Sequence, residues 1–328
     1  MGAGEMLYLS RDDVASLELS TLEVLEAVEE SFRQKGRGAA QLPPKVGVDA
    51  GGGAFAHAMP AAVPAAGALG MKWVAGFPDN AARGLPTIHA LIALADPTTG
   101  RPLAVMEGGL ITALRTGASA AVAARHLARR ASAVAGILGC GVQARTSVQA
   151  LAAVLPALAA VRCFDVDAVA SEAFVNDMED SMQGVEVVVC DAAEEVPLGA
   201  DVVVTAIPMG LPEPPPLGPG LLEKGALAVA LDYDAAWTPA AMTQCERVVC
   251  DDVAQARATA ASGVYLGEAP LERALDLGEV VARRKRPRRG SDERTLCLNL
   301  GIATHDVVVA RLVYDRARER GVGRRLPL

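Results

Sequence analysis

This chain has few aromatic residues, no positive net charge and no long apolar run, and these shortages limit its core and its partners. Only 3% of its 328 residues are aromatic although 51% are hydrophobic, so a core must be built mainly from Ala, Val and Leu. The formal net charge is −8, which argues against general binding to nucleic acid or to a membrane surface, because both favour a basic face. The longest uncharged apolar stretch, 146–161, is too short for a membrane span and contains Pro156. We therefore expect a soluble protein without nucleic-acid or membrane partners.

Disulfide and metal-ligand patterns are also missing. The six cysteines form no CxxC pair, and several lie in apolar, strand-like runs where a thiol behaves as a small hydrophobe, which is typical of a reducing cytoplasm. The four histidines are scattered singly, so we expect no metal site. The N-terminus has no basic segment followed by an apolar stretch, so no signal peptide is expected. A basic run, 283–289, has no interleaved aromatic residue and is expected to be a solvated loop.

Much of the chain after residue 131 alternates between Val-rich apolar runs and helical or loop segments. Such runs, buried on both faces, indicate the α/β class with a doubly wound parallel sheet. We expect its strands at 132–139, 160–167, 185–191, 201–208, 226–232 and 247–252, and helices at 142–155 and 170–183.

The chain is long enough for a second domain. Outside the parallel sheet, the pattern predicts helices at 21–38, 111–130 and 302–321 and strands at 67–77 and 87–96. The last helix is amphipathic, and we expect it to pack on the first part of the chain, with no strand after it.

A glycine-rich turn follows the first of the Val-rich strands. Gly139 and Gly141 are one residue apart, and Ala144 completes a G-x-G-x-x-A pattern between a strand and a helix. Gly139 permits the tight turn, and Gly141 lets the backbone approach a pyrophosphate. The helix start, with Val142 and Gln143, supplies N–H donors and a partial positive charge. In this context the pattern predicts a dinucleotide site.

An acidic residue ends the next expected strand, in the sequence FDVD. A carboxylate there accepts hydrogen bonds from a ribose 2′-hydroxyl and repels a 2′-phosphate, so NAD is favoured over NADP. Asp165 is the candidate, and Asp167 is the alternative that spacing leaves open.

Three cations, Lys45, Lys72 and Arg115, lie in otherwise apolar segments. An isolated cation there is costly unless it meets an anion, and three converging cations suit a substrate carboxylate, which arginine binds in a bidentate manner. A solvent-facing side chain is the alternative for each, and for Lys45 both interpretations fit equally.

Asp232 lies at the carboxyl end of an expected parallel strand, where ligands bind to open sheets. A helix cap or a surface acid is the alternative interpretation. Asp234, two residues further on, is a rival for the same role.

Five motifs occur in order along the chain: GMKWVAGFPDN, RGLPT, DPTTGRPLAVMEGG, ITALRTGASAAVAARHLAR and GILGCGVQAR. Together with the sequence of the C-terminal helix, they resemble the ornithine cyclodeaminase/μ-crystallin family from about Pro43 to the end. The resemblance implies a Rossmann-type NAD-binding domain at 114–302, inserted in an α+β substrate-binding and dimerisation domain formed by 1–113 and 303–328. It also implies a homodimer in which the sheet of the latter domain pairs across the subunits.

The same resemblance assigns roles to individual residues. Lys72 and Arg115 match carboxylate-binding residues of the family, Lys45 takes a place often held by Arg or Lys, and Thr87 matches a cofactor contact near the nicotinamide. The predicted sets are the catalytic aspartate Asp232 with Lys72; substrate-binding Lys45, His57, Lys72 and Arg115; and cofactor-binding Thr87, Arg115, Gly139, Gly141, Val142, Gln143, the ribose acid Asp165, and Asp232.

Two departures from the family count against ornithine as the substrate. Ornithine-cyclising members carry a glutamate two residues before a Met-Pro pair, whereas this chain has His57 there. They also carry DxxGK at the catalytic aspartate, whereas this chain reads DYDAAW. A neutral His57 suits a small substrate, a cationic one suits a carboxylate side chain, and a buried histidine bonded to backbone is a third interpretation.

The resemblance implies chemistry at the amino-bearing carbon of an amino acid. We expect an NAD(H)-dependent oxidoreductase that interconverts a small L-amino acid and its imine or keto acid, in the manner of alanine dehydrogenase or ketimine reductase. One alternative is a cyclodeaminase, a lyase that forms a cyclic imino acid, releases ammonia and recycles NAD. Another is a non-catalytic cofactor or ligand binder similar to μ-crystallin.

Overall fold

The computed structural model describes residues 4–209 and 213–328. It contains two compact units: one comprises the chain up to Arg115 together with Ile302–Leu328, and the other comprises Thr116–Gly301. The boundaries predicted from the sequence are 113/114 and 302/303. Which unit binds substrate and which binds NAD stays a prediction.

The first unit is built on a seven-stranded mixed sheet with the strand order β15-β1-β6-β5-β4-β3-β2. Strand β1 pairs in parallel with β6, and the other neighbouring strands are antiparallel. The strands are β1 (Glu5–Leu9), β2 (Val46–Gly51), β3 (Ala54–Val63), β4 (Ala68–Gly76), β5 (Ile88–Ala95), β6 (Pro102–Glu107) and β15 (Arg324–Pro327).

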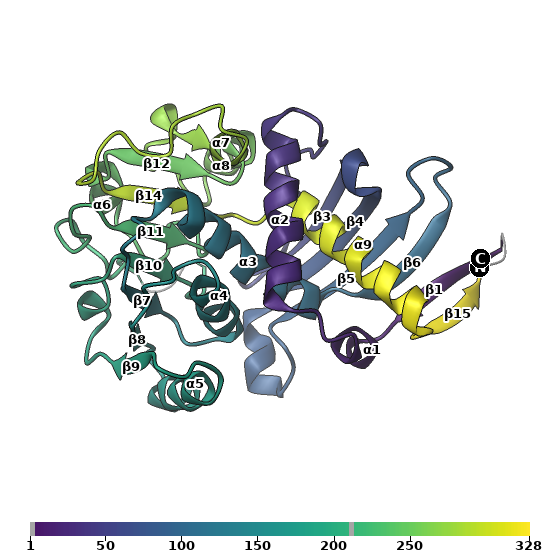
Figure 1. The fold of residues 1–328 in the computed structure, drawn as a ribbon, viewed down its shortest axis with the longest axis horizontal. Helices are drawn as coiled ribbons and strands as arrows, with labels where there is room; N and C mark the ends of the chain where they lie inside the picture. The colour runs from purple at the N-terminus through teal and green to yellow at the C-terminus, as the bar shows by residue number, and fades with distance from the viewer. Residues whose placement is uncertain (1–3, 210–212) are drawn as a thin grey trace. The chain divides into compact units, whose positions relative to one another are not determined.

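Three helices of this unit are α1 (Arg11–Ser16), α2 (Thr21–Gly36) and α9 (Ala303–Arg320). Helix α9, yellow in Figure 1, contacts β3, β4, β5 and α2. The last helix therefore packs on the first part of the chain, as predicted. Short 3-10 helices lie at Pro64–Ala66 and Pro78–Arg83.

Strand β15 shows that the prediction of no strand after the last helix is wrong. Gly321 ends α9 with a φ of 69°, and Gly323 has a φ of 95°. A Cβ at Gly323 would come within 2.5 Å of the Leu9 side chain and 2.8 Å of the Tyr8 carbonyl oxygen, so glycine is needed where the chain turns this close to β1. The strand itself reads RRLP and is exposed, which gives no apolar alternation to reveal it.

The second unit contains an eight-stranded, all-parallel sheet with the order β13-β12-β14-β11-β10-β7-β8-β9. Strand order reverses at the adjacent pair β7 and β10, so the sheet is doubly wound and the predicted fold class is confirmed. The strands are β7 (Val134–Leu138), β8 (Ala160–Phe164), β9 (Glu186–Val189), β10 (Val202–Thr205), β11 (Leu227–Ala230), β12 (Arg247–Cys250), β13 (Leu275–Asp276) and β14 (Thr295–Leu298).

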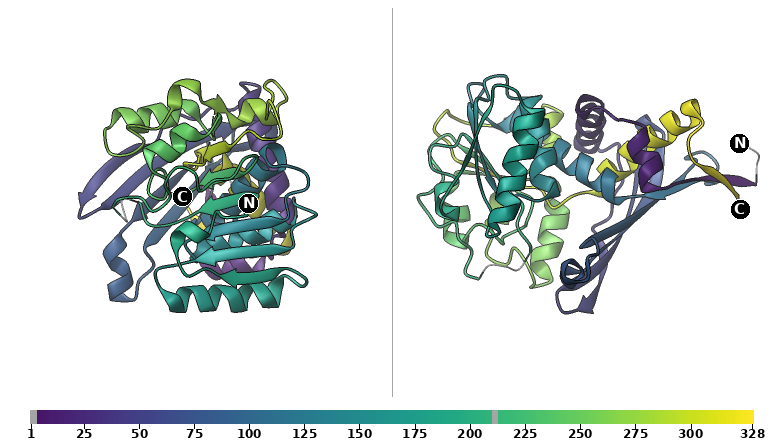
Figure 2. Two further views of the ribbon diagram at one scale, coloured as in Figure 1. Left: turned by 90° about the vertical axis from the view of Figure 1, so that its left-hand side faces the viewer. Right: turned by 90° about the horizontal axis from the view of Figure 1, so that it is seen from below.

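Helices connect these strands, and Figure 2 shows α4 and α5 in teal and the green helices after them flanking the sheet. They are α4 (Val142–Ala152), α5 (Ala168–Ser181), α6 (Pro239–Gln244), α7 (Val253–Ala261) and α8 (Leu277–Val281), with 3-10 helices at Ala193–Glu195 and Leu271–Arg273. Helix α3 (Gly109–Leu127) runs across the boundary at Arg115, so it belongs partly to each unit.

Three features of the second unit differ from the predictions. Strands β13 and β14 were not predicted. The two residues of β13 are too few to show a period, whereas the four residues of β14, TLCL, were overlooked although this strand is as long as β10, β11 and β12. Strand β9 is not buried on both faces, since it lies at the sheet edge and Val188 and Val189 are 37% and 46% exposed. The basic run is not entirely solvated: the Arg288 guanidinium donates to the carbonyl oxygens of Leu127 and Gly225 at 2.9 and 3.0 Å.

Within the described ranges, none of the helices combines the length and the apolar character needed to cross a membrane. The same residues contain no group of three or more His, Cys, Asp or Glu side chains arranged to hold a metal ion. All six cysteines are buried free thiols.

Candidate functional site

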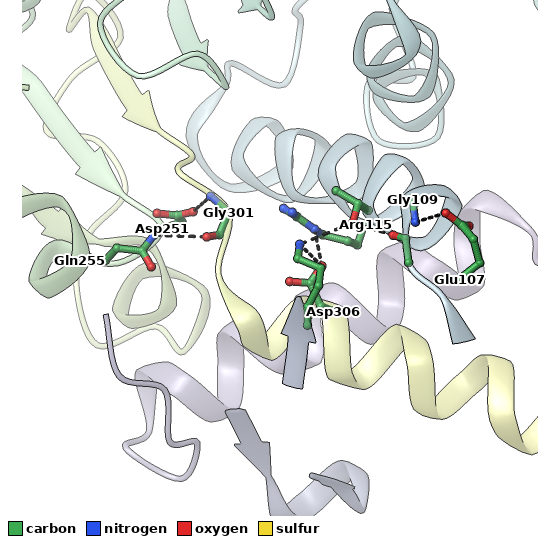
Figure 3. Close-up of polar contacts among 10 residues, drawn as sticks. Glu107, Gly109, Arg115, Asp251, Gln255, Gly301 and Asp306 are labelled. Atoms are coloured by element: carbon green, nitrogen blue, oxygen red, sulfur yellow. Dashed lines mark hydrogen bonds and ion pairs between the residues drawn. The ribbon is translucent and has the colours of Figure 1, made fainter. Parts of the chain in front are cut away.

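Lys72, Arg115 and Asp306 form a buried ionic cluster in the first unit. Lys72 lies on β4 and is 1% exposed, because its strand partners Met59 and Ile92 place it on the inner face of the sheet. Its Nζ lies 2.7 Å from Oδ1 of Asp306, and Nε of Arg115 lies 2.8 Å from the same oxygen. Figure 3 shows Arg115 on α3 and Asp306 on α9 pointing toward one another.

Local structure explains where Arg115 sits. The carboxylate of Glu107 accepts hydrogen bonds from the backbone N–H groups of Gly109 at 2.5 Å and Leu110 at 3.1 Å, which caps the start of α3 (Figure 3). Arg115 lies on this first part of the helix, less than two turns from the cap.

The cluster carries two cations against one carboxylate. Burial lowers the pKa of Lys72 to about 7, helped by the charge of Arg115 and opposed by Asp306. Burial alone would raise the pKa of Asp306, but Arg115 and Lys72 hold it below the usual value, so this carboxyl is ionised. The predicted solvent-facing alternatives for Lys72 and Arg115 are wrong.

Lys45 and His57 lie near this cluster. Lys45 is half-buried just before β2, and its charge acts on both Lys72 and His57. His57 lies on β3, where its ring centroid is 4.7 Å from that of Phe55 and a Cβ at Gly47 would come within 2.4 Å of the ring. Burial, then Lys45 and Lys72, lower the pKa of His57 to about 4, which favours the neutral form over the cationic one.

The glycine turn lies between β7 and α4 of the second unit. Gly139 has a φ of 90°, and a Cβ there would come within 2.6 Å of the Ala206 carbonyl oxygen, so the tight turn requires glycine. A Cβ at Gly141 would meet no atom within 4 Å, and Val142 behind it is 62% exposed. Space beside the helix start is therefore open, as a bound pyrophosphate would need.

The two acids after β8 have different partners. Asp165 is half-buried, and its carboxylate accepts hydrogen bonds from the backbone N–H groups of Cys140 at 2.7 Å and Asp167 at 3.0 Å. Asp167 is exposed and caps α5 by accepting from Val169 N–H at 3.0 Å. Only Asp165 of this pair is joined to the glycine turn, which favours it as the ribose acid.

Asp232 is 2% exposed and lies two residues after the end of β11. Its carboxylate accepts from the Thr205 hydroxyl at 2.8 Å and from Ile207 N–H at 3.1 Å. Burial raises its pKa to about 6, although these hydrogen bonds lower it. Asp234 instead accepts from Leu266 N–H at 2.6 Å and so holds a loop.

Gln143 lies in the first turn of α4, and Thr87 is exposed immediately before β5, where its carbonyl oxygen accepts from Phe77 N–H at 2.8 Å. Sequence reasoning missed Asp306 and Thr205. Asp306 lies among apolar residues in the sequence THDVVVA, and a lone charge in such a segment needs a partner, so this pattern is the signal that points to it.

Known proteins resemble this chain over almost its full length. The family model described as ornithine cyclodeaminase/mu-crystallin matches residues 5–321. The chain belongs to this family. It is 36% identical over 328 residues to alanine dehydrogenase of Archaeoglobus fulgidus, covering 98% of each chain.

Solved structures of family members have the same fold. An archaeal alanine dehydrogenase dimer with bound NAD has a TM-score of 0.87 at 36% identity, with 99% of each chain covered. The Δ1-pyrroline-2-carboxylate reductase of Thermococcus litoralis, in complex with NADH and L-proline, has a TM-score of 0.86 at 32% identity, covering 97% of this chain and 99% of the other. These matches confirm the family predicted from the five motifs.

Proposed function

We propose that this chain is an NAD(H)-dependent oxidoreductase that interconverts a small L-amino acid and its imine or keto acid. The observation that carries the proposal is Asp232, a buried carboxylate with a pKa of about 6 at the carboxyl end of a parallel strand. Oxidation of an amino acid to an imine needs a base near neutral pH, because the nitrogen must lose a proton before its lone pair can form the double bond.

The residues of the second unit fit NAD. Bound NAD supplies the hydride acceptor, and NADH the hydride donor, for the amino-bearing carbon. Gly139 and Gly141 with Val142 and Gln143 would hold the pyrophosphate, since the space beside Gly141 is open and α4 begins there. Asp165, held by Cys140 N–H, would accept from the ribose hydroxyls. Thr87 stays the proposed contact near the nicotinamide.

The residues of the first unit fit an amino-acid carboxylate. Lys72 and Arg115 share one oxygen of Asp306, so their positive charge exceeds its negative charge. A substrate carboxylate would balance that excess, with the guanidinium giving a planar fork and Lys45 a further charge. Asp232 would then take the proton from the ammonium group in oxidation and return a proton in reduction.

The surroundings of His57 favour the oxidoreductase over a cyclodeaminase. A cyclising enzyme must hold the distal ammonium of a diamino acid, and a carboxylate serves this purpose. Here the side chain is a neutral imidazole, and the charges of Lys45 and Lys72 act on it. The same two charges would repel the distal ammonium of a diamino acid. We therefore propose substrates whose side chain carries no positive charge.

We also propose that the first unit forms a homodimer through the outer face of its sheet. Val46, Trp73 and Leu91 are 66%, 44% and 49% exposed. They lie in one row across the strands, because Val46 pairs with Ala58, Ala58 with Trp73, and Trp73 with Leu91. A monomer rarely exposes such a contiguous apolar face, and the similar archaeal alanine dehydrogenase is a dimer.

The decisive experiment incubates the protein with NAD and a panel of amino acids, and then with NADH, ammonia and keto acids or with cyclic imines. Net formation or consumption of NADH supports the oxidoreductase. Ammonia release without net change of NADH would instead identify the lyase. Neither change, with NADH still bound, would identify a non-catalytic binder.

A further inference from the structure

Asp306 joins two cations that are far apart in the sequence. Its Oδ1 lies 2.7 Å from Nζ of Lys72 and 2.8 Å from Nε of Arg115, so one carboxylate oxygen serves a strand residue and a helix residue at once. The side chain is 0% exposed. Its contacts therefore form in the protein interior, where a charge without a partner is strongly destabilising.

Asp306 lies in the first turn of α9, where an acid can serve simply to stabilise the helix start. Its carboxylate instead accepts hydrogen bonds from the side chains of Lys72 on β4 and Arg115 on α3. Without this carboxylate, two like charges would face each other in a buried place. The contact geometry thus ties Asp306 to the cations rather than to its own helix.

We propose that Asp306 is the positioning residue of the substrate-carboxylate site: it keeps Lys72 charged and holds Lys72 and Arg115 side by side. This proposal rests on the proposed function, in which these two cations bind the carboxylate. Because two positive charges share one negative charge, the cluster keeps one positive charge in excess. A substrate carboxylate would balance it.

Several other groups face this cluster. The hydroxyl oxygen of Thr112 on α3 accepts a hydrogen bond from Lys72 Nζ at 3.4 Å. The charge of Lys45 acts on Lys72, and that of Lys72 on His57. His305, next to Asp306, packs edge-on against Phe32 with ring centroids 4.3 Å apart, and burial followed by the charge of Arg115 holds its pKa well below the ordinary value. Asp306 thus differs from these groups in contacting both cations with a carboxylate oxygen.

If Asp306 acts through its charge, it should change the pH dependence of substrate binding, which a purely structural role would not. With Asp306 present, the pKa of Lys72 is about 7, and Asp306 acts to raise it. Carboxylate binding uses the protonated amine, so substrate affinity should fall as the pH rises through this value. Removing the negative charge lowers the pKa of Lys72 further, so the same loss should occur at a lower pH.

The experiment compares the full-length protein with Asp306→Asn and Asp306→Glu, measuring KM and kcat for the preferred substrate from about pH 5 to about pH 9, a range of about two units either side of neutrality. Asp315→Asn is the matched control, since Asp315 is also on α9 but pairs with Arg311 at 2.7 Å and is 43% exposed. NADH fluorescence titration and circular dichroism report cofactor binding and folding separately from turnover.

We expect Asp306→Asn to raise KM by about tenfold to a hundredfold, the range that follows from loss of a hydrogen bond to a charged group, and to change kcat less. Its KM should begin to rise at a lower pH than in the unmodified protein, while NADH binding is retained. Asp306→Glu keeps the charge, so its pH dependence should match the unmodified protein although KM increases. Asp315→Asn should behave as unmodified protein.

An Asp306→Asn variant that binds NADH and has an unchanged KM and pH dependence would overturn the proposal. If that variant fails to fold, Asp306→Glu decides: a raised KM with unchanged pH dependence supports the proposal, and an unchanged KM or a shift to lower pH contradicts it. If the unmodified protein turns over no substrate, the proposed function fails, and pyruvate binding measured by calorimetry with NADH present still tests Asp306 by the same criteria.

Discussion

The carboxylate of Asp232 accepts a hydrogen bond from the hydroxyl of Thr205, with 2.8 Å between Oδ1 and Oγ1. Thr205 is the last residue of β10, and Asp232 follows β11, the neighbouring strand in the sheet. Parallel pairing therefore brings together two side chains that lie 27 positions apart. Burial raises the pKa of Asp232 to about 6, and the bonds from Thr205 and from Ile207 N–H oppose this rise.

Replacing Thr205 by valine should move the pH dependence of amino-acid oxidation upward. Valine keeps the shape but donates no hydrogen bond, so the pKa of Asp232 rises above its value of about 6. A base must be ionised to accept a proton, so activity is lost as the pH falls through this pKa, and the variant should lose it at a higher pH. The measurement is kcat/KM against pH.

Thr98→Val is the matched control for this variant. Thr98 donates to the carboxylate of Asp96 at 2.5 Å in the exposed turn after β5, and we assign no role in the reaction to either residue. Two outcomes would argue against Asp232 as the base. One is that the pH at which kcat/KM falls on the acid side is unchanged in Thr205→Val, and the other is that this pH shifts equally in Thr98→Val.

Asp232→Asn should reduce turnover by roughly a hundredfold to ten-thousandfold, because asparagine cannot accept the proton. NAD binding and the fold should be retained, since the amide oxygen can still accept from Thr205. Asp234→Asn should cost much less, because Asp234 accepts from Leu266 N–H and holds a loop. Steady-state kinetics with NAD titrations distinguish the two. If Asp234→Asn were inactive while Asp232→Asn remained active, Asp234 rather than Asp232 would be the base.

Asp165→Ala should weaken NAD binding by about tenfold to a hundredfold and narrow the preference for NAD over NADP. The carboxylate that accepts from the ribose and repels a 2′-phosphate is then gone, as is its hydrogen bond from Cys140 N–H. Dissociation constants for NADH and NADPH, taken from fluorescence titrations, test this. Equal affinities in the unmodified protein would refute the assignment.

The control for this prediction is Asp167→Ala. Asp167 caps α5, so its loss should cost about 1 kcal/mol of stability while leaving the ratio of NADH to NADPH affinity unchanged. Thermal unfolding would register the first effect and the titrations the second.

The parts of the fold that follow from local pattern could be predicted from the sequence. Buried parallel strands are continuous apolar runs, so the core of the second sheet follows from the sequence. The glycine turn follows from its G-x-G-x-x-A pattern between a strand and a helix, and the structure gives Gly139 the positive φ that such a turn requires. The edge strands β13 and β15 are short or charged, and their pairing is made by backbone groups that leave no side-chain period.

Individual residues of the candidate site could be predicted from the sequence, but the contacts among them could not. Lys72 and Arg115 stood out because isolated cations need a partner, yet the partner, Asp306, lies 234 residues beyond Lys72 in the sequence. No spacing rule links them, since the contact depends on how α9 packs on β4. The charge of His57 was also undetermined, because it depends on burial and on Lys45 and Lys72.

His57→Glu should shift the substrate preference toward diamino acids. The new carboxylate would lie near Lys45 and Lys72 and could accept a hydrogen bond from a distal ammonium, which the neutral imidazole with a pKa of about 4 does not attract. We expect the ratio of kcat/KM for ornithine to that for alanine to rise by roughly tenfold.

His57→Gln supplies the uncharged comparison for that change. It should leave the ratio near that of the unmodified protein, because it adds hydrogen-bonding capacity without a charge. If glutamine and glutamate changed the ratio equally, charge at this position would not decide substrate choice.

Trp73→Asp should weaken the proposed homodimer by about thirtyfold or more, since truncating a central interface tryptophan commonly costs about 2 kcal/mol and the aspartate adds a desolvated charge. Trp73 is 44% exposed in the middle of the apolar row formed with Val46 and Leu91. Leu22→Asp is the control, because Leu22 is similarly exposed, at 51%, but lies on α2. Sedimentation equilibrium should show a monomer fraction that increases on dilution for Trp73→Asp but not for Leu22→Asp. A dimer that tolerates Trp73→Asp while Leu22→Asp dissociates would place the interface on the helical side of the first unit instead.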